Sequence, residues 1–163
     1  MSRTLSSLGC IGLLFAGFIT STAFGAVQNP ENQLADLIRQ LSNHEISRVE
    51  IAAVPFDFET RSALTPELVN SAFDRKLILA NFLGRPFEQS LIAVLQQTRI
   101  KNPGTIPDLR ISIEFYKQGE QSSTAEISLD RSGVLGTLDG MPMTFNTALW
   151  NWLRTNYSHC FNW

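Results

Sequence analysis

Two carboxylates, Asp57 and Glu59, form the pair of side chains best spaced for acid–base chemistry. In an extended segment, residues two apart point to the same side and their carboxyl groups lie about 7 Å apart. That separation suits general acid–base hydrolysis of a glycosidic bond. Arg61 shares the same side, however, and surface clusters of mixed charge are usually incidental. We therefore expect no catalytic site here, and we keep a periplasmic hydrolase using Asp57 and Glu59 as the alternative function.

Histidine and cysteine do not combine into a metal or nucleophile site. Neither His44 nor His159 has a ligand-type residue two or four positions further on, as zinc-binding segments often do. His159 and Cys160 are adjacent, so their side chains point in different directions, whereas a catalytic Cys–His pair joins distant parts of a chain. No Gly-x-Ser-x-Gly elbow and no phosphate-binding glycine loop occurs. The sequence therefore predicts no catalytic residue, no metal and no cofactor.

A set of polar side chains near the C-terminus forms a first candidate binding surface. Polar residues alternate with apolar ones there and so share one side of a predicted sheet: Arg110, Ser112, Glu114 and Tyr116 on one strand, and Thr124, Glu126 and Ser128 on the next. The competing explanation is that they are the solvated side of a sheet that buries its other side.

The aromatic C-terminus is a second candidate. Trp152 and Trp163 are the rings hardest to bury, and exposed aromatics are enriched at protein interfaces. The alternative is that the tail folds back and packs against the sheet.

The strands that carry the first set are the clearest elements of the sequence. Apolar and polar residues alternate over 109–116 and 124–129, and a third strand is expected over 134–138. Asp139-Gly140 then predicts a two-residue hairpin into 141–145. Short turns connect only antiparallel neighbours, so the sequence predicts a C-terminal three-strand meander closed by that hairpin.

The rest of the chain reads as helices and two further strands. Strands are expected over 47–55, continuing in extended form to 61, and over 76–80. Helices are expected to begin at Asn29-Pro30, Thr65-Pro66, Gly84-Arg85-Pro86 and Asn146, where capping residues or prolines precede apolar stripes. The predicted fold class is α+β: a mostly antiparallel sheet of four to six strands, flanked by three to four helices.

The first 25 residues contain the three parts of a secretory signal peptide. Arg3 supplies the positive start, an apolar stretch covers 8–19, and Ala23-Phe24-Gly25 provides the small residues that signal peptidase accepts. We expect cleavage after Gly25, with Ala23 as a second site, and an exported protein that is periplasmic or, as second choice, secreted. Two alternatives fit the order of the parts less well: an uncleaved anchor over 5–27, and a lipoprotein modified at Cys10.

After cleavage, residues 26–163 are expected to form a single globular domain. Without Arg3, 12 Lys and Arg remain against 15 Asp and Glu, a net charge of −3 with no basic run. Nucleic acids and anionic membranes attract positive charge, so we expect neither as a partner. Cys160 remains alone, so no internal disulfide can form. We expect it to be a small buried apolar side chain, with an intermolecular disulfide or a reactive thiol as alternatives.

These features together predict a small exported binding protein without catalysis. Its partner is expected to be another protein, and an inhibitor or immunity-type role against a toxic or lytic enzyme is the most concrete version. Besides the hydrolase, a small-molecule binding module between helix and sheet remains an alternative.

Overall fold

A computed structural model describes residues 29–57, 59–60, 62–102 and 107–161. They form one antiparallel sheet of seven strands in the order β2-β1-β4-β5-β6-β7-β3. Four consecutive strands make a meander through the centre of the sheet: β4 (Leu109–Lys117), β5 (Ala125–Asp130), β6 (Leu135–Leu138) and β7 (Met141–Phe145). The remaining strands flank the meander: β1 (Ile46–Ala53), β2 (Arg75–Ala80) and β3 (Ile100–Lys101).

The four helices are α1 (Pro30–Ser42), α2 (Pro66–Ala72), α3 (Pro86–Gln97) and α4 (Ala148–Tyr157). Proline occupies the first turn of α1, α2 and α3, where its missing N–H costs nothing. The side chains of Asn29 and Thr65 cap α1 and α2, as the sequence predicts.

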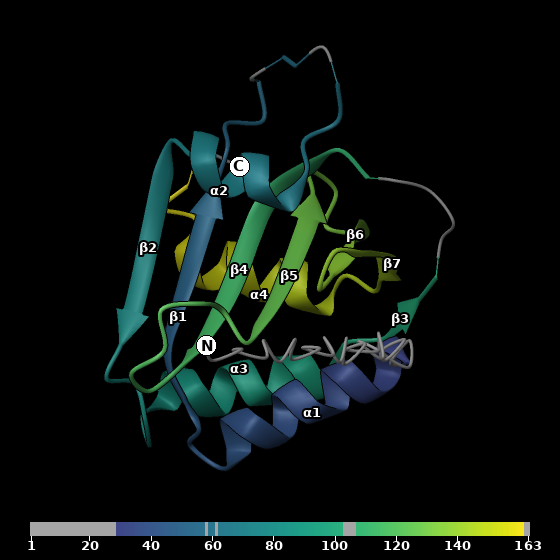
Figure 1. The fold of residues 1–163 in the computed structure, drawn as a ribbon. Helices are drawn as coiled ribbons and strands as arrows, with labels where there is room; N and C mark the ends of the chain where they lie inside the picture. The colour runs from purple at the N-terminus through teal and green to yellow at the C-terminus, as the bar shows by residue number, and fades with distance from the viewer. Residues whose placement is uncertain (1–28, 58, 61, 103–106, 162–163) are drawn as a thin grey trace, which may run out of the picture.

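The main core lies on one face of the sheet, under α1, α3 and α4. Leucines from these helices pack onto the apolar residues of β1, β4 and β5, among which Phe115 is fully buried. The opposite face, which we call the polar face, carries Arg48, Glu50, Ser112, Glu114, Tyr116, Glu126, Ser128 and Thr137. In Figure 1, α4 passes behind β4 and β5, whereas α2 lies across the upper end of the sheet.

Helix α2 covers one end of the polar face through a second, smaller apolar cluster. Val69 of α2 packs there with Val54, Leu64 and Leu109. The rest of the polar face has no helix over it in the described part of the chain (Figure 1).

The α+β fold is confirmed, and three details differ from the expectation. The sheet has seven strands rather than four to six, because β3 pairs with β7. With two residues, β3 is too short to show alternation in the sequence. Phe56 and Asp57 form a turn and do not extend β1: β1 ends at Ala53, beside its last β2 partner Arg75, and Pro55 has no N–H to offer. Asn146 does not cap α4: its side chain bonds the Arg99 N–H and the Gln97 carbonyl instead.

Candidate functional site on the polar face

Four carboxylates form a line across the polar face. The antiparallel register places Glu50 of β1 opposite Glu114 of β4, and Glu114 opposite Glu126 of β5. Asp139 in the β6–β7 turn continues the line, since its Oδ1 accepts the Glu126 N–H at 2.8 Å. Side chains directly opposite in such pairs are about 5 Å apart. We call Glu50, Glu114, Glu126 and Asp139 the carboxylate row.

Glu50, at one end of the row, is neutralised within the chain. The Lys76 ammonium lies 2.5 Å from its Oε2 and the Arg48 guanidinium 3.1 Å from its Oε1. The Arg48 guanidinium also lies over the Tyr116 ring, 4.0 Å from its centroid, which holds this cation at the β1 end of the row.

The other three carboxylates have no basic partner among the described residues. Glu126 Oε1 accepts hydrogen bonds from the hydroxyls of Ser112 at 2.7 Å and Ser128 at 2.9 Å, and a long one from the Asn70 amide at 3.5 Å. Glu114 accepts the Tyr116 hydroxyl at 2.9 Å. These donors are neutral, so they orient the carboxylates without cancelling their charge.

Burial and mutual repulsion act on the row together. Burial raises the pKa of Glu114, and the charges of Glu126 and Glu50 raise it further, whereas the bond from Tyr116 and the charge of Lys76 oppose the rise. Burial also raises the pKa of Asp139, again with a contribution from Glu126. The Tyr116 hydroxyl has a raised pKa through burial and its bond to Glu114, so it remains a donor. The row therefore holds more negative charge than the described basic residues balance.

Two buried side-chain oxygens near the row also have no hydrogen-bond partner among the described residues. Thr137, opposite Ser128 and only 4% exposed, has a buried hydroxyl oxygen without a hydrogen bond. The side-chain carbonyl of Asn70 is likewise buried and unbonded. Buried polar groups are usually satisfied, so unsatisfied acceptors beside uncompensated carboxylates favour a group rich in N–H donors at this place.

The raised pKa of Glu114 gives a test of this electrostatic description. Between its unfolded and folded pKa values, the native state binds more protons, so stability falls as pH rises through that window. We expect Glu114→Gln to raise the melting temperature at pH 7 and to have little effect at pH 4. Thermal unfolding at both pH values measures this. An equal shift at both values would contradict the assigned charge penalty.

The structure brings together three of the six residues predicted to bind. Glu114, Tyr116 and Glu126 lie side by side around the row. Arg110 lies at the far end of β4, buried, with its Nη2 2.6 Å from the Asp108 carboxylate. Burial tends to raise the pKa of that carboxylate, but bonds from the Leu64 N–H and Arg110 lower it overall.

Trp152, one of the two candidate tryptophans, is not part of this site. Trp152 lies on the core side of the sheet, half-buried against Phe87 and Tyr157, with its indole N–H donating to Ser90 Oγ at 2.6 Å. Trp163 lies outside the described residues. The chain before it does fold back, because Phe161 is buried in the core. Cys160 beside it is half-buried and free.

The sequence correctly places Ser112 and Ser128 on the polar side of the meander, but sequence reasoning missed Glu50, Asp139 and Asn70. Alternation puts Glu50 on one side of its own strand, and only the register shows that it is a neighbour of Glu114. Asn70 reaches the row from α2, and no sequence signal indicates that contact.

The alternative catalytic pair borders a polar hollow of about 630 Å³. Asp57 and Glu59, both exposed, line it together with Asp108, Arg131 and the buried Arg110. The hollow meets the requirement for a concave site, but two arginines compete for the carboxylates in it.

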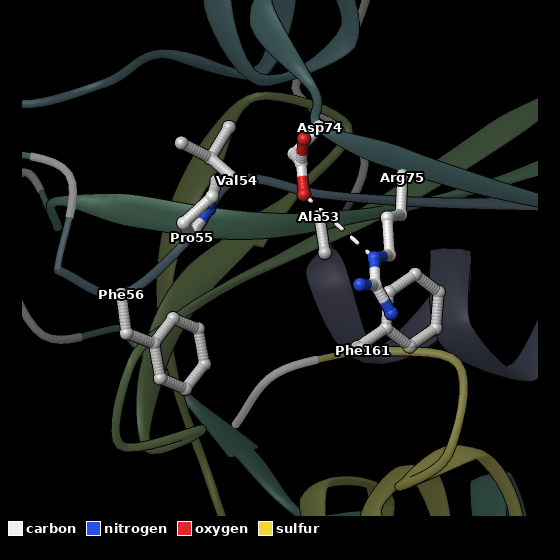
Figure 2. Close-up of a pocket in the computed structure, with 7 residues that line it drawn as sticks. All are labelled: Ala53, Val54, Pro55, Phe56, Asp74, Arg75 and Phe161. Atoms are coloured by element: carbon white, nitrogen blue, oxygen red, sulfur yellow. Dashed lines mark ion pairs between the residues drawn. The ribbon is translucent and has the colours of Figure 1, made fainter.

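Two further hollows lie elsewhere on the molecule. The one shown in Figure 2 lies at the end of β1, between Phe56 on one side and Asp74, Arg75 and Phe161 on the other. Its free volume is about 10 Å³, room for one water at most. Here the Arg75 Nη1 donates to the Cys160 carbonyl at 3.0 Å and fastens the C-terminal segment to β2.

The other, about 410 Å³, lies between the start of α2 and the β6–β7 hairpin, and is mainly apolar. Its position between helix and sheet agrees with the place expected for a small-molecule pocket.

No group of three or more His, Cys, Asp or Glu side chains in the described part of the chain is arranged to hold a metal ion. None of the described helices is long and apolar enough to cross a membrane. Comparison with known proteins finds no matching family, no similar curated protein and no similar solved structure.

Proposed function

We propose that this protein is a non-enzymatic binding protein that holds a cationic segment of another protein on its polar face. One observation carries the proposal: Glu114, Glu126 and Asp139 lie in line, partly desolvated, and none of them forms an ion pair with another described residue. Uncompensated charges of one sign on a surface attract a partner of the opposite sign and reject others.

An arginine side chain fits the chemistry of the site well. A guanidinium has five N–H donors and no acceptor, and it pairs with carboxylates in a fixed, planar geometry. The carboxylate row offers only acceptors toward it, and the unbonded oxygens of Thr137 and Asn70 lie near. The arrangement favours a protein rather than a small molecule, since the row lies on a sheet face and not in an enclosed cavity.

An inhibitor or immunity-type role is the specific form that we propose. Such a protein would cover basic residues of a toxic or lytic enzyme, which agrees with the expected export of the chain. The predicted leader in residues 1–25 lies outside the described residues, so export stays a prediction from the sequence.

The test measures binding of a pentaarginine peptide by isothermal titration calorimetry. We expect binding that weakens with added salt, and a loss of about tenfold or more in the double variant Glu114→Gln/Glu126→Gln. Glu120→Gln is the matched control, because Glu120 is exposed in the β4–β5 turn, outside the row, and removes the same charge. Equal binding by the wild type and the double variant would overturn the proposal.

The same variants test the natural partner. A 1:1 complex recovered from periplasmic extract should be lost with the double variant and kept with Glu120→Gln. A complex that survives the double variant would place the contact elsewhere.

The polar hollow beside Asp57 and Glu59 favours one second candidate, a hydrolase of wall or glycan polymers. If this candidate is right, Asp57→Asn abolishes polymer hydrolysis and leaves the melting temperature unchanged, because Asp57 is exposed. Wild-type protein without hydrolytic activity would exclude it.

A further inference from the structure

Strand β2 is an edge of the sheet. Among the described residues it pairs with β1 alone, and Figure 1 shows it as the outermost strand. Leu77 and Leu79 are half-buried toward the core, while Ile78 points to the polar face and is 57% exposed, more than any other large hydrophobic residue described. An apolar edge strand with free backbone groups is a template for pairing with another strand.

The basic side chains of β2 do not protect this edge. Arg75 is held by its bond to the Cys160 carbonyl and by Asp74. Lys76 is held by Glu50 and lies 5.5 Å from the centroid of the Phe73 ring. Both cations point back into their own molecule, so neither repels an approaching strand.

The hydrogen-bond pattern of β1 shows which groups of β2 are free. The Val54 N–H donates to the Arg110 carbonyl at 2.9 Å, so even-numbered residues of β1 bond toward β4 and odd-numbered ones toward β2. Ile51 is opposite Leu77, and Leu77 therefore bonds toward β1. The N–H and C=O groups of Lys76, Ile78 and Ala80 consequently point out of the sheet.

We propose that β2 pairs antiparallel with β2 of a second copy of this chain, around a two-fold axis at Ile78. In this register Ile78 is opposite the same residue of the copy, Lys76 is opposite Ala80, and Leu77 is opposite Leu79. All three outward-facing residues of each strand then form hydrogen-bonded pairs, and the two sheets become one.

The strand is complementary to itself in this arrangement, which is the reason for choosing a second copy as the occupant. Even-numbered residues pair with even-numbered ones and odd with odd, so the polar faces of the two sheets lie on one side and their core faces on the other. On the polar face, Ile78 packs against Ile78 of the second copy. On the core face, Leu77 packs against Leu79 of the second copy, and Leu79 against Leu77. No two like charges are opposite, since Lys76 meets alanine and Arg75 meets Asn81.

Sedimentation of the purified protein over about a hundredfold concentration range tests the dimer. We expect a dimer that dissociates on dilution, and a monomer at all concentrations for Ile78→Lys, which places two ammonium groups at the axis. Ala35→Lys is the control: it adds the same charge at an exposed position of α1, which packs on α3 and β6, and should remain dimeric. A wild-type monomer throughout, or dimeric Ile78→Lys, would overturn the proposal.

Mixing two variants tests the register. Ile78→Lys and Ile78→Glu should each be monomeric alone and should form a mixed dimer together, because residue 78 faces its own copy only when the axis passes through it. No mixed dimer would refute the proposed register. The double variant Glu114→Gln/Glu126→Gln should stay dimeric, which separates this proposal from the proposed function.

Discussion

Replacing Gly136 with alanine is expected to destabilise the folded protein by about 3 kcal/mol or more. Gly136 lies in β6, opposite Leu129 of β5 and Met143 of β7. A Cβ built there would overlap the backbone carbonyl oxygen of Ser128 and lie 3.0 Å from the Phe145 ring. The Ser128 carbonyl belongs to the central ladder and cannot move without breaking strand pairing, so the cost cannot be relieved by a side-chain rotation.

Urea unfolding of Gly136→Ala and Gly140→Ala measures this effect. Gly140 is the control because its φ is +77° but nothing lies within 4 Å of an added Cβ. Its substitution should cost only the backbone strain of the turn, about 1 kcal/mol. Equal stability of the two variants would show that β6 does not approach the Ser128 carbonyl of β5 this closely.

Part of the site could be predicted from the sequence, and the part that could not depends on how the strands are aligned with one another. Alternation along residues 109–116 and 124–129 correctly predicts two strands and the side on which Glu114 and Glu126 lie. Alternation carries no information on the register between strands. The carboxylate row forms because the register brings Glu50 and Asp139 into line with Glu114 and Glu126. Register depends on turn geometry and packing between distant segments, including the contact that requires Gly136.

The elements that sequence reasoning placed least well are those fixed by tertiary contacts. β3 has two residues and owes its existence to pairing with β7. Trp152 was a candidate for an exposed binding residue, yet Phe87 and Tyr157 supply a half-buried niche and Ser90 accepts its N–H. The helix caps at Asn29 and Thr65 are local, and the sequence predicts both correctly.

The second large effect is expected at Glu88, a carboxylate that is only 2% exposed. Its Oε1 lies 2.9 Å from His44 Nδ1, and its Oε2 accepts the Gly84 N–H at 2.6 Å. Glu88 is in the first turn of α3, where the helix dipole favours negative charge. The Glu88 side chain thus links His44, in the turn between α1 and β1, to Gly84 just before α3.

Glu88→Ala is expected to cost about 1.5–3 kcal/mol, because it removes the charged acceptor of the Gly84 N–H and releases His44, which adopts a φ of +60°. Glu88→Gln should cost less, since its amide oxygen can still accept the Gly84 N–H. His44→Ala should cost about 1 kcal/mol or less, since the His44 side chain is 58% exposed. Unfolding of the two alanine variants and of the double variant completes a mutant cycle. A coupling energy of zero between His44 and Glu88 would show that the carboxylate stabilises the fold through the Gly84 N–H alone. A cost below about 1 kcal/mol for Glu88→Ala would contradict the proposed link between the two segments.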